Sequence, residues 1–261
     1  MVDSTVVGGG RGRPRGAGRR GLLAAVAALA LVLVAVGLAP NPSSRAATGT
    51  AVEPSPVWAG WLAVGGGECT ATLVRPWMAI TARHCGTENP VLKLGVTSTA
   101  DSNPAKVYTV TKIVKHDDLD VEALYLDGSA PWSNSVTWGD GYGYDPASKE
   151  PLRLWGFGLN SSDTDTGRLT VATFPRTDPC ASGLGADQGD FCFNVTDPSS
   201  NGLCAGDSGA PITQGNKIVA MATAVLQADP TQRFSCSKVA FGQAIPITKI
   251  AGWLHDRSCE A

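Results

Sequence analysis

The chain has 261 residues, of which 43% are hydrophobic and 17% are charged, so it is long enough for one large globular domain or two small ones. Its formal net charge is −2, but residues 1–46 hold six Arg and one Asp, which leaves 15 basic and 22 acidic residues, a net charge of −7, in the rest of the chain. An acidic body without a run of Lys or Arg excludes an extended surface for a phosphate backbone, and we expect no nucleic-acid partner.

The first 46 residues have the pattern of an export signal. Five Arg between residues 11 and 20 precede an uncharged apolar run at residues 22–39, and Pro40 and Pro42 end any helix there. Eighteen uncharged residues are also close to the length of a membrane span, so an uncleaved anchor is the alternative. We therefore expect a secreted protein, or a membrane-anchored one whose folded domain lies outside.

The cysteines fit that compartment. All seven follow the apolar run, and in an oxidising environment we expect disulfide bridges rather than metal ligands. No Cys-x-x-Cys pair occurs, and three His are too few for an evident zinc set, so we expect no metal and no other cofactor. Because seven is odd, at least one thiol is left over. The seven are Cys69, Cys85, Cys180, Cys192, Cys204, Cys236 and Cys259.

Short apolar runs bounded by turn residues begin at residue 58, after a lead-in segment or short propeptide at residues 47–57. Twelve of them have the length and composition of β-strands, whereas residues 247–255 have apolar side chains at helical spacing. This pattern predicts all-β barrels or sandwiches, with the turn-rich residues 138–146 as the crossing between two of them. The predicted strands are residues 58–64, 70–74, 78–82, 91–96, 107–114, 121–126, 152–157, 168–174, 191–195, 211–213, 217–225 and 238–244.

Residues 206–211, which read Gly-Asp-Ser-Gly-Ala-Pro and which we call the nucleophile loop, are a candidate for a reactive Ser. Gly206 would let the backbone approach a substrate closely, and the N–H groups of Gly206 and Ser208 could point together at a developing oxyanion. An ordinary surface turn is the alternative, because Asp, Ser and Gly are also turn residues. The catalytic interpretation therefore depends on partners elsewhere.

A Ser hydroxyl needs a base, and the chain offers three imidazoles. His84 directly follows an apolar run and precedes Cys85, which could pin the end of that strand. His116 has the surroundings of a solvated loop, and His255 lies on the predicted helix. His84 is the predicted base, with a structural His at a strand end as the alternative.

An imidazole base needs a carboxylate that holds its tautomer and stabilises the imidazolium. Four acidic residues crowd one stretch of the chain. Asp120 stands at the start of a predicted strand, where its side chain could enter a crevice, whereas Asp117, Asp118 and Glu122 are interpreted as solvated charges. We therefore predict Asp120 as the partner of His84.

Three motifs in this order, at residues 81–85 (Thr-Ala-Arg-His-Cys), 120–124 (Asp-Val-Glu-Ala-Leu) and 206–211, resemble the chymotrypsin/trypsin family of serine proteases. The order His, Asp, Ser excludes the subtilisin and α/β-hydrolase arrangements. Residues 69–73 and 154–158 also resemble strands of the family.

The resemblance covers about residues 58–261 and implies a fold. That fold consists of two packed antiparallel six-stranded β-barrels, at about residues 58–145 and 146–261, with a short C-terminal helix. It makes the folded domain a trypsin-like serine protease domain.

Carried to the matching positions, the resemblance implies roles for individual residues. Ser208 is then the nucleophile, His84 the general base and Asp120 its orienting partner. The N–H groups of Gly206 and Ser208 form the oxyanion hole. Three disulfides are also implied, which leave Cys259 as the odd thiol: Cys69–Cys85, Cys180–Cys192 and Cys204–Cys236.

Two residues depart from the family pattern. Arg83 replaces a small residue before the His, and Glu122 interrupts a run that is usually apolar. Many family members pair the Asp before the Ser, here Asp207, with a freed N-terminal amine. In this chain its partner would be an internal Arg or an N-terminus within residues 47–57.

The substrate pocket can be compared in the same way. Gly202 stands where trypsin-like members carry an Asp, so a preference for Lys or Arg lacks its usual anion. Thr223, Ala224 and Val225 resemble the strand that pairs with an extended peptide. Val225 takes a place usually held by Gly and should narrow the pocket, which predicts small or medium apolar side chains before the cleaved bond.

Together these observations predict a secreted, monomeric serine endopeptidase that acts on proteins or peptides through an acyl-enzyme intermediate. A membrane contact is expected only if the N-terminal segment is not cleaved. Two alternatives are a catalytically impaired, protease-like binding protein and an esterase on the same scaffold.

Overall fold

The structure is a computed structural model, and the parts of it described below belong to one compact unit, residues 46–261. The predicted export signal, most of the lead-in segment, and residues 139–142 of the predicted crossing at residues 138–146 lie outside the described residues. The described residues are 50–51, 56–86, 88–131, 138, 143–159, 167–174, 176–177, 191–194, 204–227, 231, 233, 235–236 and 239–258.

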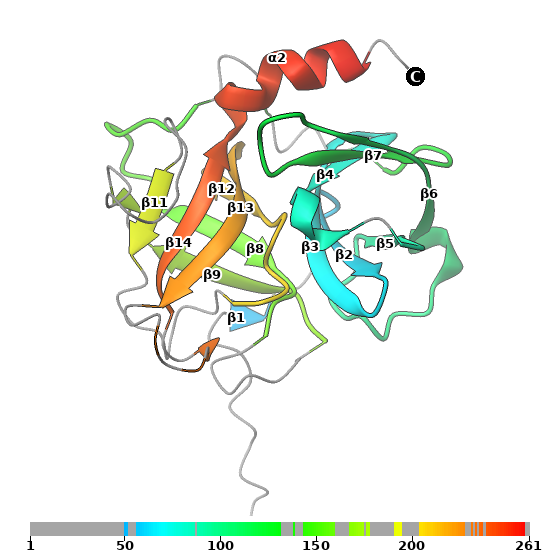
Figure 1. Ribbon diagram of the computed structural model, residues 1–261, viewed down its shortest axis with the longest axis horizontal. Coiled ribbons are helices and arrows are strands. Elements are labelled where there is room, and N and C mark those ends of the chain that lie inside the picture. The colour runs from blue at the N-terminus through cyan, green and yellow to red at the C-terminus, as the bar shows by residue number, and fades with distance from the viewer. Residues whose placement is uncertain are drawn as a thin grey trace, which may run out of the picture. The chain divides into compact units, whose positions relative to one another are not determined.

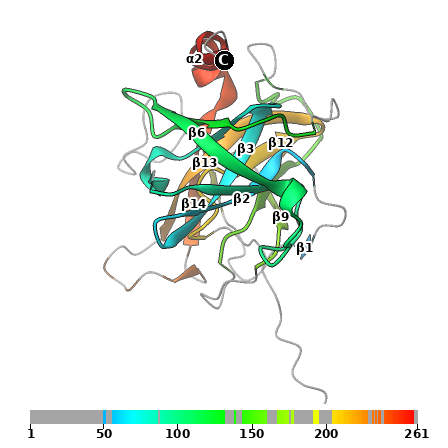
Figure 2. The ribbon, with the colours of Figure 1, turned by 90° about the vertical axis from the view of Figure 1, so that its right-hand side faces the viewer.

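Six antiparallel strands close into a barrel in the first half of the described chain, in the order β2-β3-β4-β7-β6-β5. Figures 1 and 2 show this barrel, with β6 crossing in front of β2 and β3 in the second view. Each strand matches a run that the apolar pattern predicted. Their bounds are β2 Ala59–Val64, β3 Gly67–Arg75, β4 Met78–Thr81, β5 Val91–Leu94, β6 Val107–Lys115 and β7 Glu122–Leu126.

The barrel forms because apolar side chains from all parts of this segment fill its interior. The strands β4 and β7 are buried along their whole length, whereas β6 is exposed or half-buried throughout and alternates between the two over its first five residues. Strands buried on both faces have continuous apolar runs, and strands with one solvated face alternate. Fully buried side chains of this core include Leu62, Leu73, Ile80, Leu92 and Leu124.

The second half and the short strand β1, which precedes the barrel in the chain, form an antiparallel sheet of eight strands in the order β1-β9-β8-β12-β13-β14-β11-β10. Its two edge strands, β1 (Thr50–Ala51) and β10 (Arg176–Thr177), have two residues each, too few to carry an apolar pattern. The barrel, this sheet and one short C-terminal helix confirm the predicted all-β class. The other strands are β8 Leu152–Gly156, β9 Thr170–Phe174, β11 Phe191–Asn194, β12 Pro211–Gln214, β13 Lys217–Gln227 and β14 Val239–Pro246.

The helix α2 (Ile247–Ser258) follows β14 directly and lies above the strands in Figure 1. Ile247, Ile250 and Leu254 are buried, as their helical spacing predicts. Among the described residues, no helix is long and apolar enough to cross a membrane.

Contacts between the barrel and the sheet position the site. Trp58, just before β2, packs edge to face against Trp155 of β8, with 5.0 Å between ring centroids. The Thr99 and Leu169 N–H groups donate hydrogen bonds to the carbonyl oxygens of Gly167 and Thr97, which joins the β5–β6 connection to the start of β9. These contacts therefore fix the position of the barrel relative to the sheet.

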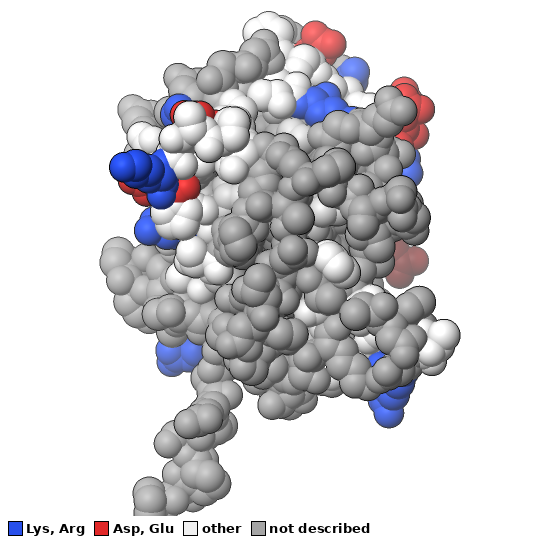
Figure 3. Space-filling model, turned by 90° about the vertical axis from the view of Figure 1, so that its left-hand side faces the viewer, with Lys and Arg blue, Asp and Glu red and all other residues white. Residues whose placement is uncertain are grey.

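The described surface carries charges of both signs. Figure 3 shows one face of the molecule, on which Lys and Arg side chains stand apart from one another and several have Asp or Glu side chains beside them.

Candidate active site

The structure brings His84, Asp120 and Ser208 together, although Asp120 is 36 positions and Ser208 is 124 positions away from His84 in the chain. The Nδ1 of His84 lies 2.6 Å from Oδ2 of Asp120, and its Nε2 lies 2.9 Å from Oγ of Ser208. An ionised carboxylate can only accept, so Nδ1 carries the proton and Nε2 is left to accept from the Ser hydroxyl. This is the geometry of a hydroxyl whose proton can pass to an imidazole.

A second hydrogen bond fixes the carboxylate. The backbone N–H of His84 donates to Oδ1 of Asp120 over 3.0 Å, so each carboxylate oxygen has its own donor. The hydrogen bond that His84 donates to Asp120 raises the pKa of His84, although burial acts in the opposite direction. Burial alone would raise the pKa of Asp120, but its hydrogen bonds with His84 and the His84 and Arg83 charges lower the pKa overall. The pair therefore favours an ionised Asp120 and stabilises a protonated imidazole.

The single-turn helix η1 (Arg83–Cys85) carries His84 at the end of β4. The disulfide Cys69–Cys85 ties this turn to β3, as the resemblance implied. Arg83, whose role the sequence left unexplained, donates from Nη1 to the carbonyl oxygens of His116 and Asp117, each over 3.0 Å. Arg83 therefore clamps the segment that leads to Asp120 against the turn that carries His84.

The rejected candidates have other roles or positions. The Nδ1 of His116 accepts from the N–H groups of Asp118 and Leu119, both over 3.2 Å, so this imidazole organises the loop before β7. Asp117 and Asp118 are exposed, and His255 is exposed on α2. The structure places no one of these four side chains in the hydrogen-bonded set around Ser208.

The nucleophile loop is held by threonines of the barrel, a feature that sequence reasoning missed. The Thr70 N–H donates to the Ser208 carbonyl oxygen over 2.9 Å, and Thr70 Oγ1 donates to the Gly206 carbonyl oxygen over 2.9 Å. Thr72 Oγ1 donates to the Gly209 carbonyl oxygen over 2.8 Å. Strand β3 therefore fixes the position of the nucleophile loop relative to His84.

Two glycines of the loop are required by conformation and by space. Gly206 and Gly209 have φ values of 97° and 86°, where only Gly is unstrained. A Cβ on Gly209 would overlap the Thr70 carbonyl oxygen and the Thr81 hydroxyl oxygen. The loop can therefore bend sharply at Ser208, which leaves the N–H groups of Gly206 and Ser208 as the predicted oxyanion donors.

Asp207 is buried beneath the loop. Its Oδ1 accepts from the Gly158 N–H and its Oδ2 from the Cys204 N–H, both over 2.8 Å. Burial raises its pKa to about 7, although both backbone hydrogen bonds act to lower the pKa. In the described part of the chain the salt bridges are His84–Asp120 and Lys106–Asp101, and neither includes Asp207. Two backbone N–H groups therefore satisfy the Asp207 carboxyl. The predicted partner, an internal Arg or an N-terminal amine within residues 47–57, stays a prediction.

Two glycines of β8 and the residues after it make room for that carboxyl. A Cβ on Gly156 or on Gly158 would overlap the carboxyl group of Asp207. The motif at residues 154–158 thus has a spatial reason for its glycines, which only the folded chain reveals.

Glu122 is buried, which contradicts its interpretation as a solvated loop charge. It opens β7, a strand that pairs with β4 on one side and β6 on the other, so a side chain directed inward there has no route to water. Burial raises its pKa to about 7.

The residues predicted to bind the substrate are partly described. Thr223, Ala224 and Val225 lie in β13, and Oγ of Ser208 lies 3.5 Å from the Thr223 carbonyl oxygen. Strand β13 therefore runs directly beside Ser208. Gly202 lies outside the described residues.

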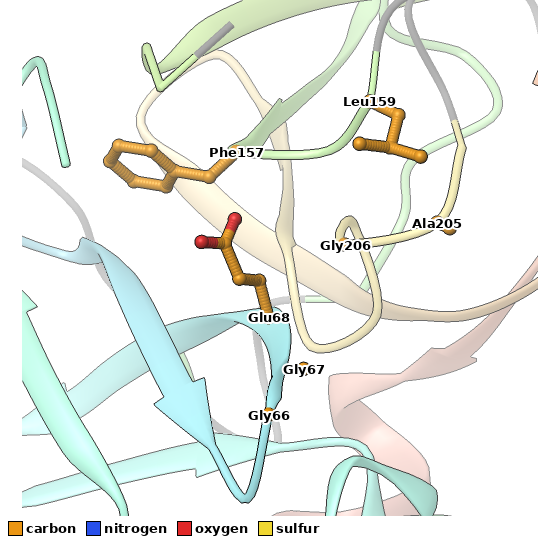
Figure 4. A pocket seen from close by; sticks show the side chains of 7 residues that line it. All are labelled: Gly66, Gly67, Glu68, Phe157, Leu159, Ala205 and Gly206. Atoms are coloured by element: carbon orange, nitrogen blue, oxygen red, sulfur yellow. The ribbon is translucent and has the colours of Figure 1, made fainter. Parts of the chain in front are cut away.

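A cavity of about 370 Å³ opens beside Gly206. Figure 4 shows Glu68 extending from the β2–β3 hairpin toward Phe157, across the cavity from the backbone of Ala205 and Gly206. The cavity is thus bordered by one carboxylate and by the loop that carries the predicted oxyanion donors.

The bridges of the second half are also partly described. Cys204 and Cys236 form the disulfide that the resemblance implied, and this bridge anchors the start of the nucleophile loop. Cys192 is disulfide-bonded, whereas Cys180 and Cys259 lie outside the described residues.

Comparisons with known proteins agree with this geometry. A family model described as Trypsin matches residues 47–254, and a comparison with curated proteins found no match. Among solved structures, the chain is similar to neuropsin, a serine protease expressed in the limbic system of mouse brain. The two share 20% sequence identity and a TM-score of 0.65, over 80% of this chain and 98% of that chain, so this likeness concerns the fold. Because the family model spans more than half of its length, the chain belongs to the trypsin family and is a serine endopeptidase.

Proposed function

We propose that this protein is a secreted endopeptidase in which Ser208 acts as the nucleophile, His84 as the general base and the Asp120 carboxylate as the orienting partner of His84. The observation that carries the proposal is the continuous hydrogen-bonded chain from Oγ of Ser208 through the imidazole to the Asp120 carboxylate. A Ser hydroxyl becomes a good nucleophile when its proton has an acceptor in place. The cradle of β3 threonines supports the same role, because it holds the nucleophile at a fixed distance from the base.

In the proposed reaction, Oγ of Ser208 attacks the carbonyl carbon of the scissile peptide bond while its proton passes to Nε2 of His84. The carbonyl oxygen becomes an oxyanion and accepts hydrogen bonds from the N–H groups of Gly206 and Ser208. His84 then gives the proton to the leaving amine, and an acyl ester on Ser208 remains. Water, deprotonated by His84, attacks this ester, which releases the acid and restores the Ser hydroxyl.

The acyl side of the substrate would lie along β13. Strand addition uses backbone hydrogen bonds and therefore accepts many sequences, so pockets decide the specificity. The half-buried Val225 narrows the place where the side chain before the cleaved bond would enter, which supports a preference for small or medium apolar residues. A strong preference for Arg in a panel of peptide substrates would contradict this part of the proposal.

The leaving side of the substrate would reach the cavity beside Gly206. The Glu68 carboxylate at its edge supports a preference for a basic side chain after the cleaved bond. Glu68→Gln should reduce that preference without changing the preference before the bond. If Glu68→Gln lowers kcat/KM equally for substrates with basic and with neutral side chains after the cleaved bond, the proposed role of Glu68 is contradicted.

Export is part of the proposal. The Arg-rich start and apolar run of residues 1–46 support it, as do the disulfides Cys69–Cys85 and Cys204–Cys236, which need an oxidising compartment. N-terminal sequencing and the intact mass of the exported protein distinguish a cleaved signal from a membrane anchor.

Kinetics with a single substitution test the catalytic proposal. Ser208→Ala should lower kcat by about 10⁶-fold in a peptide assay, because the nucleophile and its base act as a unit. A loss below about tenfold removes Ser208 from the mechanism and favours a different hydrolytic site.

A further inference from the structure

Glu122 is a buried carboxyl that the proposed mechanism does not use. Its side chain is fully inaccessible, with an exposed fraction of 0%, and neither of its oxygens has a hydrogen-bond partner among the described residues. A buried carboxyl without a donor is costly, because it loses water and gains nothing in exchange. Such a group at a position two residues after Asp120 requires an explanation.

The strand pairing tells which way Glu122 points. Glu122 lies directly opposite Thr81 of β4, and residues directly opposite in an antiparallel pair share a face of the sheet. Thr81 Oγ1 donates to the Thr70 carbonyl oxygen over 2.8 Å, and its side chain limits the space at Gly209. Glu122 therefore lies on the face of the barrel that supports the nucleophile loop.

Charged groups of β6, of η1 and of the segment before β7 act on Glu122. On the other side of β7, Lys115 of β6 is its cross-strand neighbour, Asp120 precedes it in the chain, and His84 and Arg83 lie on η1. Burial is the main influence and raises the pKa of Glu122; Lys115 then lowers it, Asp120 raises it, and His84 and Arg83 lower it. The influence is mutual, because a negative charge on Glu122 raises the pKa of His84.

We propose that Glu122 is a positioning residue for catalysis: when ionised, its carboxylate stabilises the protonated imidazole of His84 and thereby sets the lower pH limit of peptide hydrolysis. The inference rests on the proposed role of His84 as the general base. Glu122 is shielded from water, so its charge is screened less than that of a surface carboxylate, although the His84 side chain that it acts on is 51% exposed. Protonation of Glu122 at lower pH removes the effect.

This arrangement has a kinetic signature. Each proton taken up by Glu122 or His84 disfavours the proton on the other group, so the two titrations spread over a wider pH range than a single ionisation. The acidic limb of kcat/KM should therefore be shallower than that of one group. A neutral side chain at position 122 should make it steeper and move it to lower pH.

The first test does not require activity. In a Ser208→Ala background, NMR follows the titration of the His84 imidazole with and without Glu122→Gln. We expect the midpoint to move to lower pH by about half a pH unit when the charge is removed. Asp127→Asn removes an exposed carboxylate just beyond β7 and should leave the midpoint in place. An unchanged His84 midpoint in Glu122→Gln overturns the inference.

The second test uses the intact nucleophile. Glu122→Gln should move the acidic limb of kcat/KM by the same amount, make it steeper, and lower kcat on the alkaline plateau about threefold, which is the rate equivalent of half a pH unit. A merely structural role would lower kcat/KM equally at every pH, and that result would also overturn the inference.

Two further outcomes are decisive. If Glu122→Gln does not fold, Glu122→Met removes the charge with a side chain that needs no hydrogen-bond partner, and the same shift is expected. If the unmodified protein hydrolyses no peptide, the proposed function fails, whereas the NMR midpoint still decides whether Glu122 acts on His84.

Discussion

Thr70 and Ser208 are joined by a backbone hydrogen bond of 2.9 Å that links strand β3 of the barrel to the nucleophile loop. The Thr70 hydroxyl adds to this link, because it donates to the Gly206 carbonyl oxygen and accepts from the Phe157 N–H over 3.1 Å. One residue of the first barrel thus fixes both sides of the predicted oxyanion hole.

Thr70→Val keeps the shape of the side chain and removes its hydroxyl. The Gly206 carbonyl and the Phe157 N–H then lose a partner in a buried place, so we expect the free energy of unfolding to fall by about 1–3 kcal/mol. We also expect kcat to fall about tenfold, because the loop loses its support. Thr109→Val, an exposed threonine on β6, is the matched control; equal effects of the two substitutions in denaturant titrations and peptide assays would contradict the role of Thr70.

Gly158→Ala tests the space around Asp207. The added methyl group would overlap the Asp207 carboxyl, so we expect a loss of about 1–3 kcal/mol in the free energy of unfolding and a clear loss of activity. Gly252→Ala, on α2, has open space around its Cβ and should leave activity unchanged while stabilising the helix by up to about 1 kcal/mol. Wild-type activity in Gly158→Ala would show that the loop does not depend on this packing.

Arg83→Met removes the two hydrogen bonds to the loop before Asp120 and removes a charge that lowers the pKa of Asp120. We expect kcat/KM to fall about three- to tenfold near neutral pH, with a larger loss in acid, where Asp120 is protonated more readily. Arg83→Lys keeps the charge but not the planar guanidinium, so its kcat/KM should lie between those of the wild type and Arg83→Met. A pH profile that only scales downward would limit Arg83 to a structural role.

Glu122→Gln should change how stability depends on pH. The pKa of Glu122 is about 7 in the folded protein against an ordinary 4.5, so the folded state keeps its proton over a pH range in which the unfolded state has lost it. This contribution to stability is complete below about pH 4.5 and is lost as the pH rises toward 7. Relative to the wild type, Glu122→Gln should gain up to about 3 kcal/mol between pH 4 and pH 8 in chemical denaturation. A constant difference between the two proteins across that range would contradict the buried ionisation.

The strands and the helix could be predicted because their signals are local. Burial in β4 and β7 leaves runs that are apolar except for Thr81 and Glu122, and α2 repeats its apolar residues every three or four positions. The two-residue strands β1 and β10 could not be predicted, since two residues carry no period.

The support of the site could not be predicted, because it depends on contacts between distant parts of the chain. Thr70 and Thr72 bond to residues more than 130 positions away, and nothing around them in the sequence marks that role. The charge of Glu122 favours the prediction of a solvated side chain. The side chain is buried instead, because β7 lies between β4 and β6. The role of Arg83 likewise depends on its hydrogen bonds to the carbonyl oxygens of His116 and Asp117, more than 30 positions away in the chain.

The most direct measurement is the intact mass of the mature, oxidised protein after treatment with a fluorophosphonate, followed by localisation of the adduct in peptides. An activated Ser208 should take up one phosphonyl group, and His84→Ala should abolish the reaction because the hydroxyl then has no proton acceptor. A protein with its disulfides formed that gains no mass, or that carries the adduct on another residue, would contradict the proposal that Ser208, His84 and Asp120 form the catalytic centre.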